Sequence, residues 1–326
     1  MHHLTKITAY ILIIFVAISI NFALPRMMPG DPITSLTDDP TTGMPVIMDE
    51  DLKEEIRSYY GLDKPISEQF TGYLKDILKC DLGWSIYYNA PVAEVIFERL
   101  KWTLLLVGTS TLIYMILGIF LGAVSAWKRG ERGDLGLLVS VLSIGSFPSF
   151  FLAMLFIILF GVKLDIFPIF GATTPFMEYS STFDAFKDVL YHLILPASTL
   201  VLTSIDGPYL LMRNSMLGVL GEDYIVTARA KGLTEWAILK DHAIKNALLP
   251  ITTVIAIRMG FMISGAIFVE TVFAYPGIGK LLYDAVSFSD YPLLQGAFLI
   301  ITLIIIAANF IADMTYLYLD PRVKHG

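Results

Sequence analysis

Residues 102–127 read WTLLLVGTSTLIYMILGIFLGAVSAW, which is 26 consecutive positions without a charged side chain. A helix needs about 20 apolar residues to cross the roughly 30 Å hydrocarbon core of a bilayer, so this stretch is long enough to span a membrane. Three further uncharged runs lie at residues 7–24, 135–162 and 293–312. The sequence therefore predicts an all-α polytopic membrane protein.

Two more apolar runs are each interrupted by a single charge. Residues 193–212 contain Asp206 and residues 248–269 contain Arg258, which brings the expected number of transmembrane helices to about six. The composition agrees, because 55% of residues are hydrophobic and 16% are charged, where a soluble domain carries about 25% charge. The first run could be a signal peptide, but its length and the lack of a small-residue cleavage pattern favour a retained span.

The distribution of Lys and Arg predicts the orientation of the spans. With the N-terminus inside, the inner segments hold eleven basic residues and the two short outer loops hold three, as the positive-inside rule requires. Both termini are then cytoplasmic. The inner basic residues are Lys6, Lys128, Arg129, Arg132, Arg213, Arg229, Lys231, Lys240, Lys245, Arg322 and Lys324, and the outer ones are Lys163, Lys187 and Lys280.

A long acidic segment follows the first span and would lie outside the cell. Residues 29–99 carry fourteen acidic and six basic side chains, a balance of −8 that accounts for the net charge of −7. Within it, residues 49–60 are typical of a short solvated helix and residues 81–85 of a turn. The segment is either a water-exposed loop or a docking face for a soluble partner, and the sequence leaves both open.

Several kinds of chemistry are not indicated. The single cysteine, Cys80, excludes an internal disulfide framework, and no Cys/His cluster has the spacing of a zinc site, so we expect no metal and no cofactor. Residues 277–280 read GIGK and lack the flanking Gly and Ser/Thr of a phosphate-binding loop. His192 and His242 are expected at loop and helix ends without a nucleophile beside them, so we do not expect an enzyme.

Residues 213–249 form the longest inner connection, and their composition predicts two short helices. The first would run over residues 224–231 and end at Gly232, which can adopt the left-handed conformation. The second would begin after Thr234 as N-cap. A polar helix-turn-helix of this kind suits a groove on another protein.

This segment resembles the EAA loop of binding-protein-dependent ABC importer permeases, in their dipeptide and oligopeptide branch. The residues that carry the resemblance are Asp223, Tyr224, Thr227, Ala228, Arg229, Ala230, Lys231, Gly232, His242, Asn246 and Pro250. Further matching motifs follow in order along the whole chain, at residues 29–32, 270–273, 275–279, 290–292, 313 and 319–322. The early PGDP motif and the long outer loop are similar to the first of the family's two paralogous permeases. Residues 226–228 read VTA where other branches have EAA, a departure that peptide-branch members share.

The resemblance implies a type I importer architecture and a set of partners. The expected partners are a second homologous permease, two ABC ATPase subunits that each grip a coupling loop, and an extracytoplasmic solute-binding protein. The expected organisation is residues 1–98 as first helix and outer loop, 99–320 as a five-helix core with the coupling loop at about 213–249, and 321–326 as a cytoplasmic tail. Closure of the ATPases on ATP would drive import of peptides or related solutes across a prokaryotic cell membrane by alternating access. The substrate stays open among dipeptides, oligopeptides, nickel complexes and oligosaccharides.

Asp206 and Arg258 support the alternative of a self-contained secondary transporter or channel, since intramembrane charges often mark transport paths. At about 1.5 Å per helical residue, each lies roughly 10 to 12 Å deep from the inner side. We expect them to form an ion pair, although each could face water separately or find a partner on the second permease.

Residues 145–149, GSFPS, combine small residues with a helix breaker and would either pack against another helix or line the path.

Overall fold

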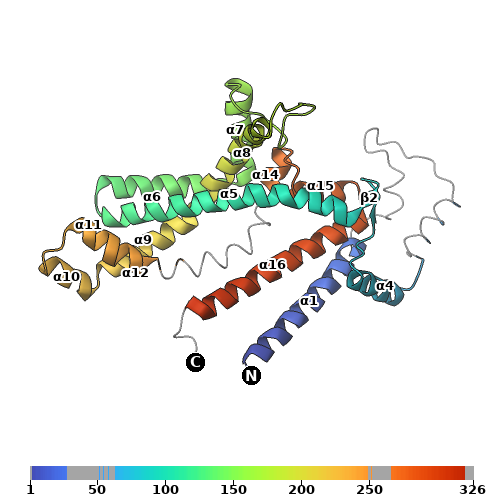
Figure 1. Cartoon of the computed structure of the whole chain (residues 1–326), viewed down its shortest axis with the longest axis horizontal. Coiled ribbons are helices and arrows are strands. Elements are labelled where there is room, and N and C mark those ends of the chain that lie inside the picture. The colour runs from blue at the N-terminus through green and yellow to red at the C-terminus, as the bar shows by residue number, and fades with distance from the viewer. Residues whose placement is uncertain are drawn as a thin grey trace. The chain divides into compact units, whose positions relative to one another are not determined.

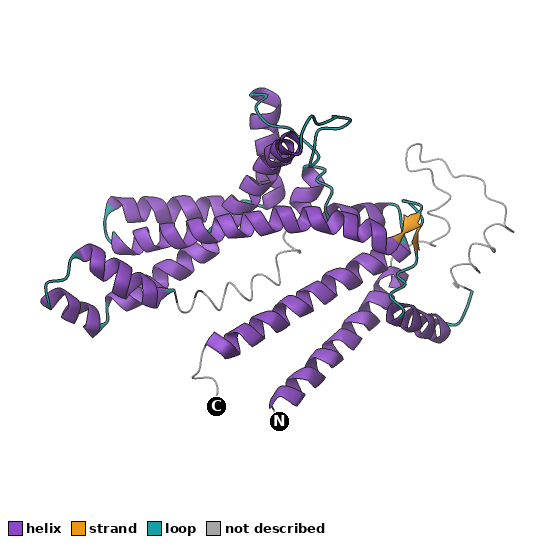
Figure 2. Ribbon diagram, in the orientation of Figure 1, coloured by secondary structure: helices purple, strands orange, loops and turns teal. Residues whose placement is uncertain are grey.

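The computed structural model describes residues 2–27, 51, 54, 58, 63–248, 251 and 266–319. In this part of the chain, the regular elements are helices and one two-stranded antiparallel hairpin (Figures 1 and 2). The elements are α1 (His2–Met27), α4 (Ile66–Leu78), β1 (Trp84–Ser85), β2 (Ala90–Pro91), α5 (Val92–Trp127), α6 (Arg132–Gly145), α7 (Ser149–Phe156), η1 (Ile157–Lys163), α8 (Thr182–Ser204), α9 (Asp206–Leu220), α10 (Asp223–Ala230), α11 (Glu235–Ala237), η2 (Ile238–Ile244), α12 (Lys245–Ala247), α14 (Ile267–Val272), α15 (Ile278–Ser287) and α16 (Tyr291–Leu319).

Three of these helices, α1, α5 and α8, are long and apolar enough to cross a membrane. The pair formed by α6 and α7–η1 also qualifies if it is counted as one bent span, and α16 contributes the shorter apolar stretch Tyr291–Ala307. The fold class predicted from the sequence, an all-α polytopic membrane protein, is confirmed. The predicted span at residues 248–269 lies almost wholly outside the described residues, as does most of the predicted helix at 49–60.

Two of the predicted spans are broken, and proline accounts for both breaks. The axes of α6 and α7–η1 differ by 94°, and Pro148 caps α7 at the bend. Between α8 and α9 the helix is interrupted at Ile205. Pro208 has no N–H to donate to the carbonyl of Ser204, so the helical ladder cannot run unbroken through this point.

The chain divides into two compact units, of which the first comprises Met1–Lys101 and Gly277–Ile306. Its hairpin is held by Asp290, a buried carboxylate that accepts hydrogen bonds from the Ser85 hydroxyl at 2.6 Å and from the Tyr87 and Leu293 amides. The turn predicted at residues 81–85 is therefore only partly a turn. Asp81 and Gly83 form it, but Trp84 and Ser85 continue as strand β1 opposite Pro91 and Ala90.

Aromatic side chains reinforce this hairpin. The Tyr87 ring stacks on Phe288 with centroids 3.8 Å apart, and the Tyr88 hydroxyl donates to Asp284 at 3.2 Å. Burial, followed by the nearby Asp284 carboxylate, raises the pKa of Tyr88 to about 12. Tyr88 therefore remains a hydrogen-bond donor at physiological pH, and the bond to Asp284 is retained.

The second unit comprises Trp102–Pro276 and Ala307–Gly326 and contains two apolar clusters. Two of its helices approach each other closely where Gly118 and Gly122 of α5 meet α9. A Cβ atom at Gly122 would lie 2.4 Å from the Tyr209 carbonyl oxygen, and one at Gly118 would lie 2.8 Å from Pro208 Cβ. These two glycines, spaced four residues apart, let the two backbones touch, as small residues do in membrane helix pairs.

We predict that Gly122→Ala destabilises the protein, because the added methyl group has no space and overpacking typically costs about 1 to 3 kcal/mol. The matched control is Gly108→Ala in the same helix, where nothing lies within 4 Å of the new Cβ. The apparent melting temperature in detergent should fall for the first variant and stay or rise slightly for the second. Equal melting temperatures for the two variants would contradict the close contact between α5 and α9.

Candidate functional site

The segment from Asp223 to Leu248 forms the helical hairpin that the sequence predicts. Helix α10 ends at Ala230, and Gly232 turns the chain with φ +76°, a value that suits glycine because it has no Cβ. The Thr234 side chain then accepts a hydrogen bond from the Ala237 amide at 3.3 Å and caps the second arm. This second arm consists of α11, the π-helical turn η2, and α12.

The inner face of this hairpin is part of the hydrophobic core of the second unit. Its buried side chains pack in one cluster with α5, α6 and α9, and they are Ile225, Ala228, Ile238, Ala243 and Ala247. Ala228, one of the residues that carry the resemblance to the EAA loop, is 5% exposed and packs within the chain. The hairpin is therefore fixed on the helices behind it and is not a loose loop.

The outer face of the hairpin carries apolar side chains that nothing in the described structure covers. Val226 is 61% exposed and Trp236 is 68% exposed, and Tyr224 and Leu233 are also exposed. Arg229 pairs with Glu235 at 3.2 Å across the turn, but both are more than half exposed, so the pair adds at most about 1 kcal/mol. Lys231 is exposed beside them.

Tyr224 and Asn246, two of the residues that carry the resemblance to the EAA loop, contact each other across the hairpin. The Asn246 side-chain amide donates to the Tyr224 hydroxyl at 3.2 Å and to the His242 carbonyl at 2.7 Å, and so links the last turn of the hairpin to its first helix.

The prediction that His192 and His242 lie at loop and helix ends is wrong. His242 lies within η2, and His192 is buried inside α8 with Nδ1 2.9 Å from the Asp188 carbonyl oxygen.

A buried polar network lies in the helices that support the hairpin. The Arg213 guanidinium of α9 makes two hydrogen bonds to the Asp134 carboxylate of α6, from Nε to Oδ1 at 3.1 Å and from Nη2 to Oδ2 at 2.9 Å. Ser125 of α5 donates to Asp134 at 2.5 Å and lies 2.7 Å from the Tyr209 hydroxyl of α9. Removing one member of this largely buried pair should be destabilising, since the other charge is left uncompensated.

Sequence reasoning missed this network. It counted Arg213 as a solvent-facing basic residue at the start of an inner loop, but α9 runs on to Leu220 and the Arg213 side chain is 15% exposed. A signal was present, because Asp134 directly precedes the uncharged run 135–162 and Arg213 directly follows the apolar run 193–212, which contains only Asp206 as a charge. Lone opposite charges at the ends of apolar runs tend to pair where water is scarce.

Asp206 lies where the two helix breaks meet. It is the first residue of α9, and a Cβ atom at Gly145, the last residue of α6, would lie 2.9 Å from Asp206 Cβ. Gly145, the first residue of the GSFPS segment, therefore permits close packing of α6 against α9.

Arg258, the partner that the sequence suggests for Asp206, lies outside the described residues, as does Pro250. Among the described residues, Asp206 has no salt-bridge partner.

Glu270 of α14, which belongs to the matching motif at residues 270–273, is fully buried. Its Oε1 accepts a hydrogen bond at 2.8 Å from the hydroxyl of Thr103, which is equally buried in α5. The glutamate of residues 270–273 therefore connects α14 to α5 inside the second unit. Burial of an acidic group of this kind requires such hydrogen bonds.

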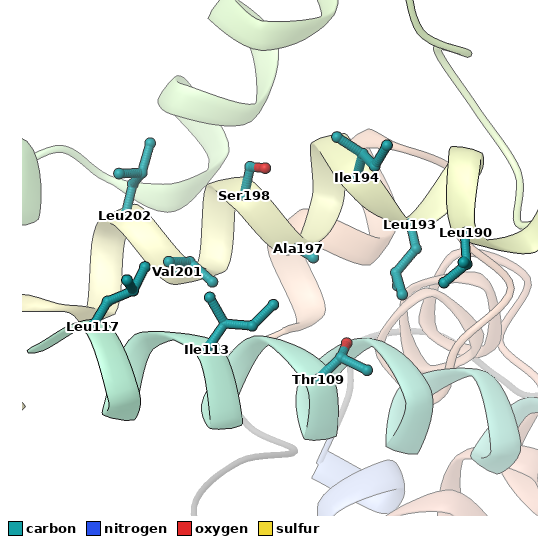
Figure 3. Close-up of a pocket in the computed structure, with 10 residues that line it drawn as sticks. All are labelled: Thr109, Ile113, Leu117, Leu190, Leu193, Ile194, Ala197, Ser198, Val201 and Leu202. Carbon is teal, nitrogen blue, oxygen red and sulfur yellow. The ribbon is translucent and has the colours of Figure 1, made fainter.

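A cavity of about 560 Å³ lies between α5 and α8 (Figure 3). Eight of its ten lining residues are aliphatic, and the two others are Thr109 and Ser198; the full lining is Thr109, Ile113, Leu117, Leu190, Leu193, Ile194, Ala197, Ser198, Val201 and Leu202. It contains no charged side chain. The cavity therefore suits hydrocarbon better than the charged ends of a peptide.

Comparison with known proteins matches residues 118–325 to the family described as binding-protein-dependent transport system inner membrane component. The chain belongs to this family. A putative peptide permease protein of Brucella ovis is 36% identical over 93% of this chain and 92% of its own length. The dipeptide transport system permease protein DppB of Escherichia coli is 34% identical over 95% of both chains, and the DppB of Alkalihalophilus pseudofirmus is 32% identical over 94% of both.

The family identifies the chain as a membrane component of a transport system that works with a binding protein. The resemblance stated from the sequence motifs is thereby confirmed. The hairpin, α9 and the Asp134–Arg213 network all lie within the residues that match this family.

Proposed function

We propose that this chain is the transmembrane permease subunit of an ABC importer of peptides, with the 223–248 hairpin as the docking site for an ATPase subunit. The observation that carries the proposal is similarity over more than nine-tenths of the chain to proteins named as peptide and dipeptide permeases. Di- and oligopeptides are the favoured substrates, and nickel complexes or oligosaccharides are the less favoured ones. A second homologous permease, two ATPase subunits and an extracytoplasmic solute-binding protein complete the complex.

The two faces of the hairpin support its docking role. Exposed apolar side chains on a polar segment mark contact surfaces, and Trp236, Val226 and Leu233 make such a surface beside Arg229 and Lys231. The opposite face is buried in the core of the second unit. Movement of a bound ATPase would therefore be transmitted to α5, α6 and α9 through packed side chains.

Reversing the charge on the outer face should uncouple transport. We expect the double variant Arg229→Glu with Lys231→Glu to insert normally but to lose ATP-driven peptide uptake and ATPase co-purification, because its substitutions lie on the exposed face. Uptake and ATP hydrolysis would be measured in proteoliposomes holding both permeases, the ATPases and the binding protein. Lys163→Glu, an exposed basic residue at the end of η1, is the control. Wild-type uptake by the double variant would refute the docking assignment, and uptake by this chain alone on an ion gradient would refute the importer.

The orientation we propose places both termini and the hairpin in the cytoplasm and residues 29–99 outside. Labelling of Cys80 tests this orientation, because Cys80 is an exposed free cysteine. A membrane-impermeant thiol reagent should label Cys80 in intact spheroplasts. In a Cys80→Ser background, Thr227→Cys on the exposed side of α10 should be labelled only after permeabilisation. The reverse pattern would show that the topology is inverted.

We also propose that Asp206 pairs with Arg258 at the inner part of the translocation path. An uncompensated charge is the costly state, so Asp206→Asn and Arg258→Gln should each reduce expression and transport more than the double variant does. The charge swap, Asp206→Arg with Arg258→Asp, should restore part of the loss. A double variant no better than the worse single one, together with a swap that restores nothing, would rule out the pair.

A further inference from the structure

The Asp134–Arg213 network ties three helices together at one point. Each carboxylate oxygen of Asp134 accepts two hydrogen bonds, Oδ1 from Ser125 and Arg213 Nε, and Oδ2 from Arg213 Nη2 and the Gly130 amide. The donors come from α5, from the turn between α5 and α6, and from α9. The network thus fixes α9 against both arms of the α5–α6 pair.

The network lies next to the hairpin along the chain and in the core. Helix α9 ends at Leu220, and α10 begins at Asp223. Tyr209, which is hydrogen-bonded to Ser125, and Met212 lie in the same apolar cluster as Ile225 and Ala228 of the hairpin. A force on the hairpin therefore acts on α9 at the turns that flank Arg213, as well as on the α5 and α6 side chains of the same cluster.

The rest of the α5–α9 contact is apolar. Gly118 and Gly122 present backbone to α9, and Met115 and Ala123 of α5 lie in one apolar cluster with Met212 and Met216 of α9. Side-chain packing favours one crossing of the two helices, but it contains no directional bond. The two-pronged Arg–carboxylate contact adds an interaction of fixed geometry.

We propose that Asp134 and Arg213 are positioning residues that make the hairpin and the α5–α6 pair move as one body, so that ATPase motion reaches the membrane helices. The proposal rests on the proposed importer function and adds the residues through which force passes. Without the pair, only apolar packing would hold α9 to the α5–α6 pair, and part of the hairpin's displacement would be lost before it reached the spans.

The decisive variant replaces both charges by apolar side chains of similar size, Asp134→Leu with Arg213→Met. Buried ion pairs exchanged in this way often keep their stability, whereas single removals do not. In the complete reconstituted complex we expect normal assembly and ATP hydrolysis, with peptide uptake per ATP reduced by about fivefold or more, the usual scale of a coupling free energy. Lys280→Met, which removes an ion pair made within α15, should leave that ratio unchanged.

Uptake per ATP in assembled complexes separates transmission from stability, because a purely structural defect lowers the amount of complex and not the ratio. An unchanged ratio in the double variant overturns the proposal. If that variant does not assemble, Ser125→Ala and Arg213→Lys decide in its place. Both retain the charges and remove single contacts of the network, so a wild-type ratio in both overturns the proposal and a reduced ratio supports it. Absence of ATP-driven uptake in the wild-type complex would instead refute the proposed function.

Discussion

Hydrocarbon offers no hydrogen-bond partner, and this constraint governs the structure of the chain. Backbone groups inside a bilayer must be paired within the protein, which leaves the helix as the available element for a spanning chain of this composition. The long apolar helices α1, α5 and α8 are continuous, although Pro25 and Pro196 each leave one hydrogen bond of the helical ladder unmade. The chain departs further from regular helix in the bent pair α6 and α7–η1 and at Ile205, and a proline follows each of these two points.

The same constraint explains why several of the buried polar side chains occur in groups. Asp134, Arg213, Ser125 and Tyr209 satisfy one another, and so do Glu270 and Thr103. In the first unit, Asp290 uses its carboxylate to hold the Ser85–Tyr87 segment. Each group connects segments that are distant in the chain, so polar groups that would be costly alone become the fixed points of the helix packing.

The contacts of α9 with α5 and α6 are of two kinds. The α5–α9 contact at Gly118 and Gly122 is apolar and close, whereas the Arg213 contact with Asp134 is directional. The hairpin that packs on these helices presents Trp236 and Val226 outward, where a moving partner would contact it.

The sequence by itself determined the elements whose causes are local. Apolar runs predicted most of the described spans, and Gly232 and Thr234 predicted the turn and the cap of the hairpin, because helix ends depend on a few neighbouring residues. The tertiary structure decided which side of the hairpin is buried, so that Ala228 packs inward while Arg229 stays exposed. It also decided that Arg213 pairs with Asp134, 79 positions earlier, and that Ser85 pairs with Asp290, 205 positions later. Such pairs depend on where helices cross and in what register, which no local pattern encodes, because the crossing is set by packing over the whole of both helices.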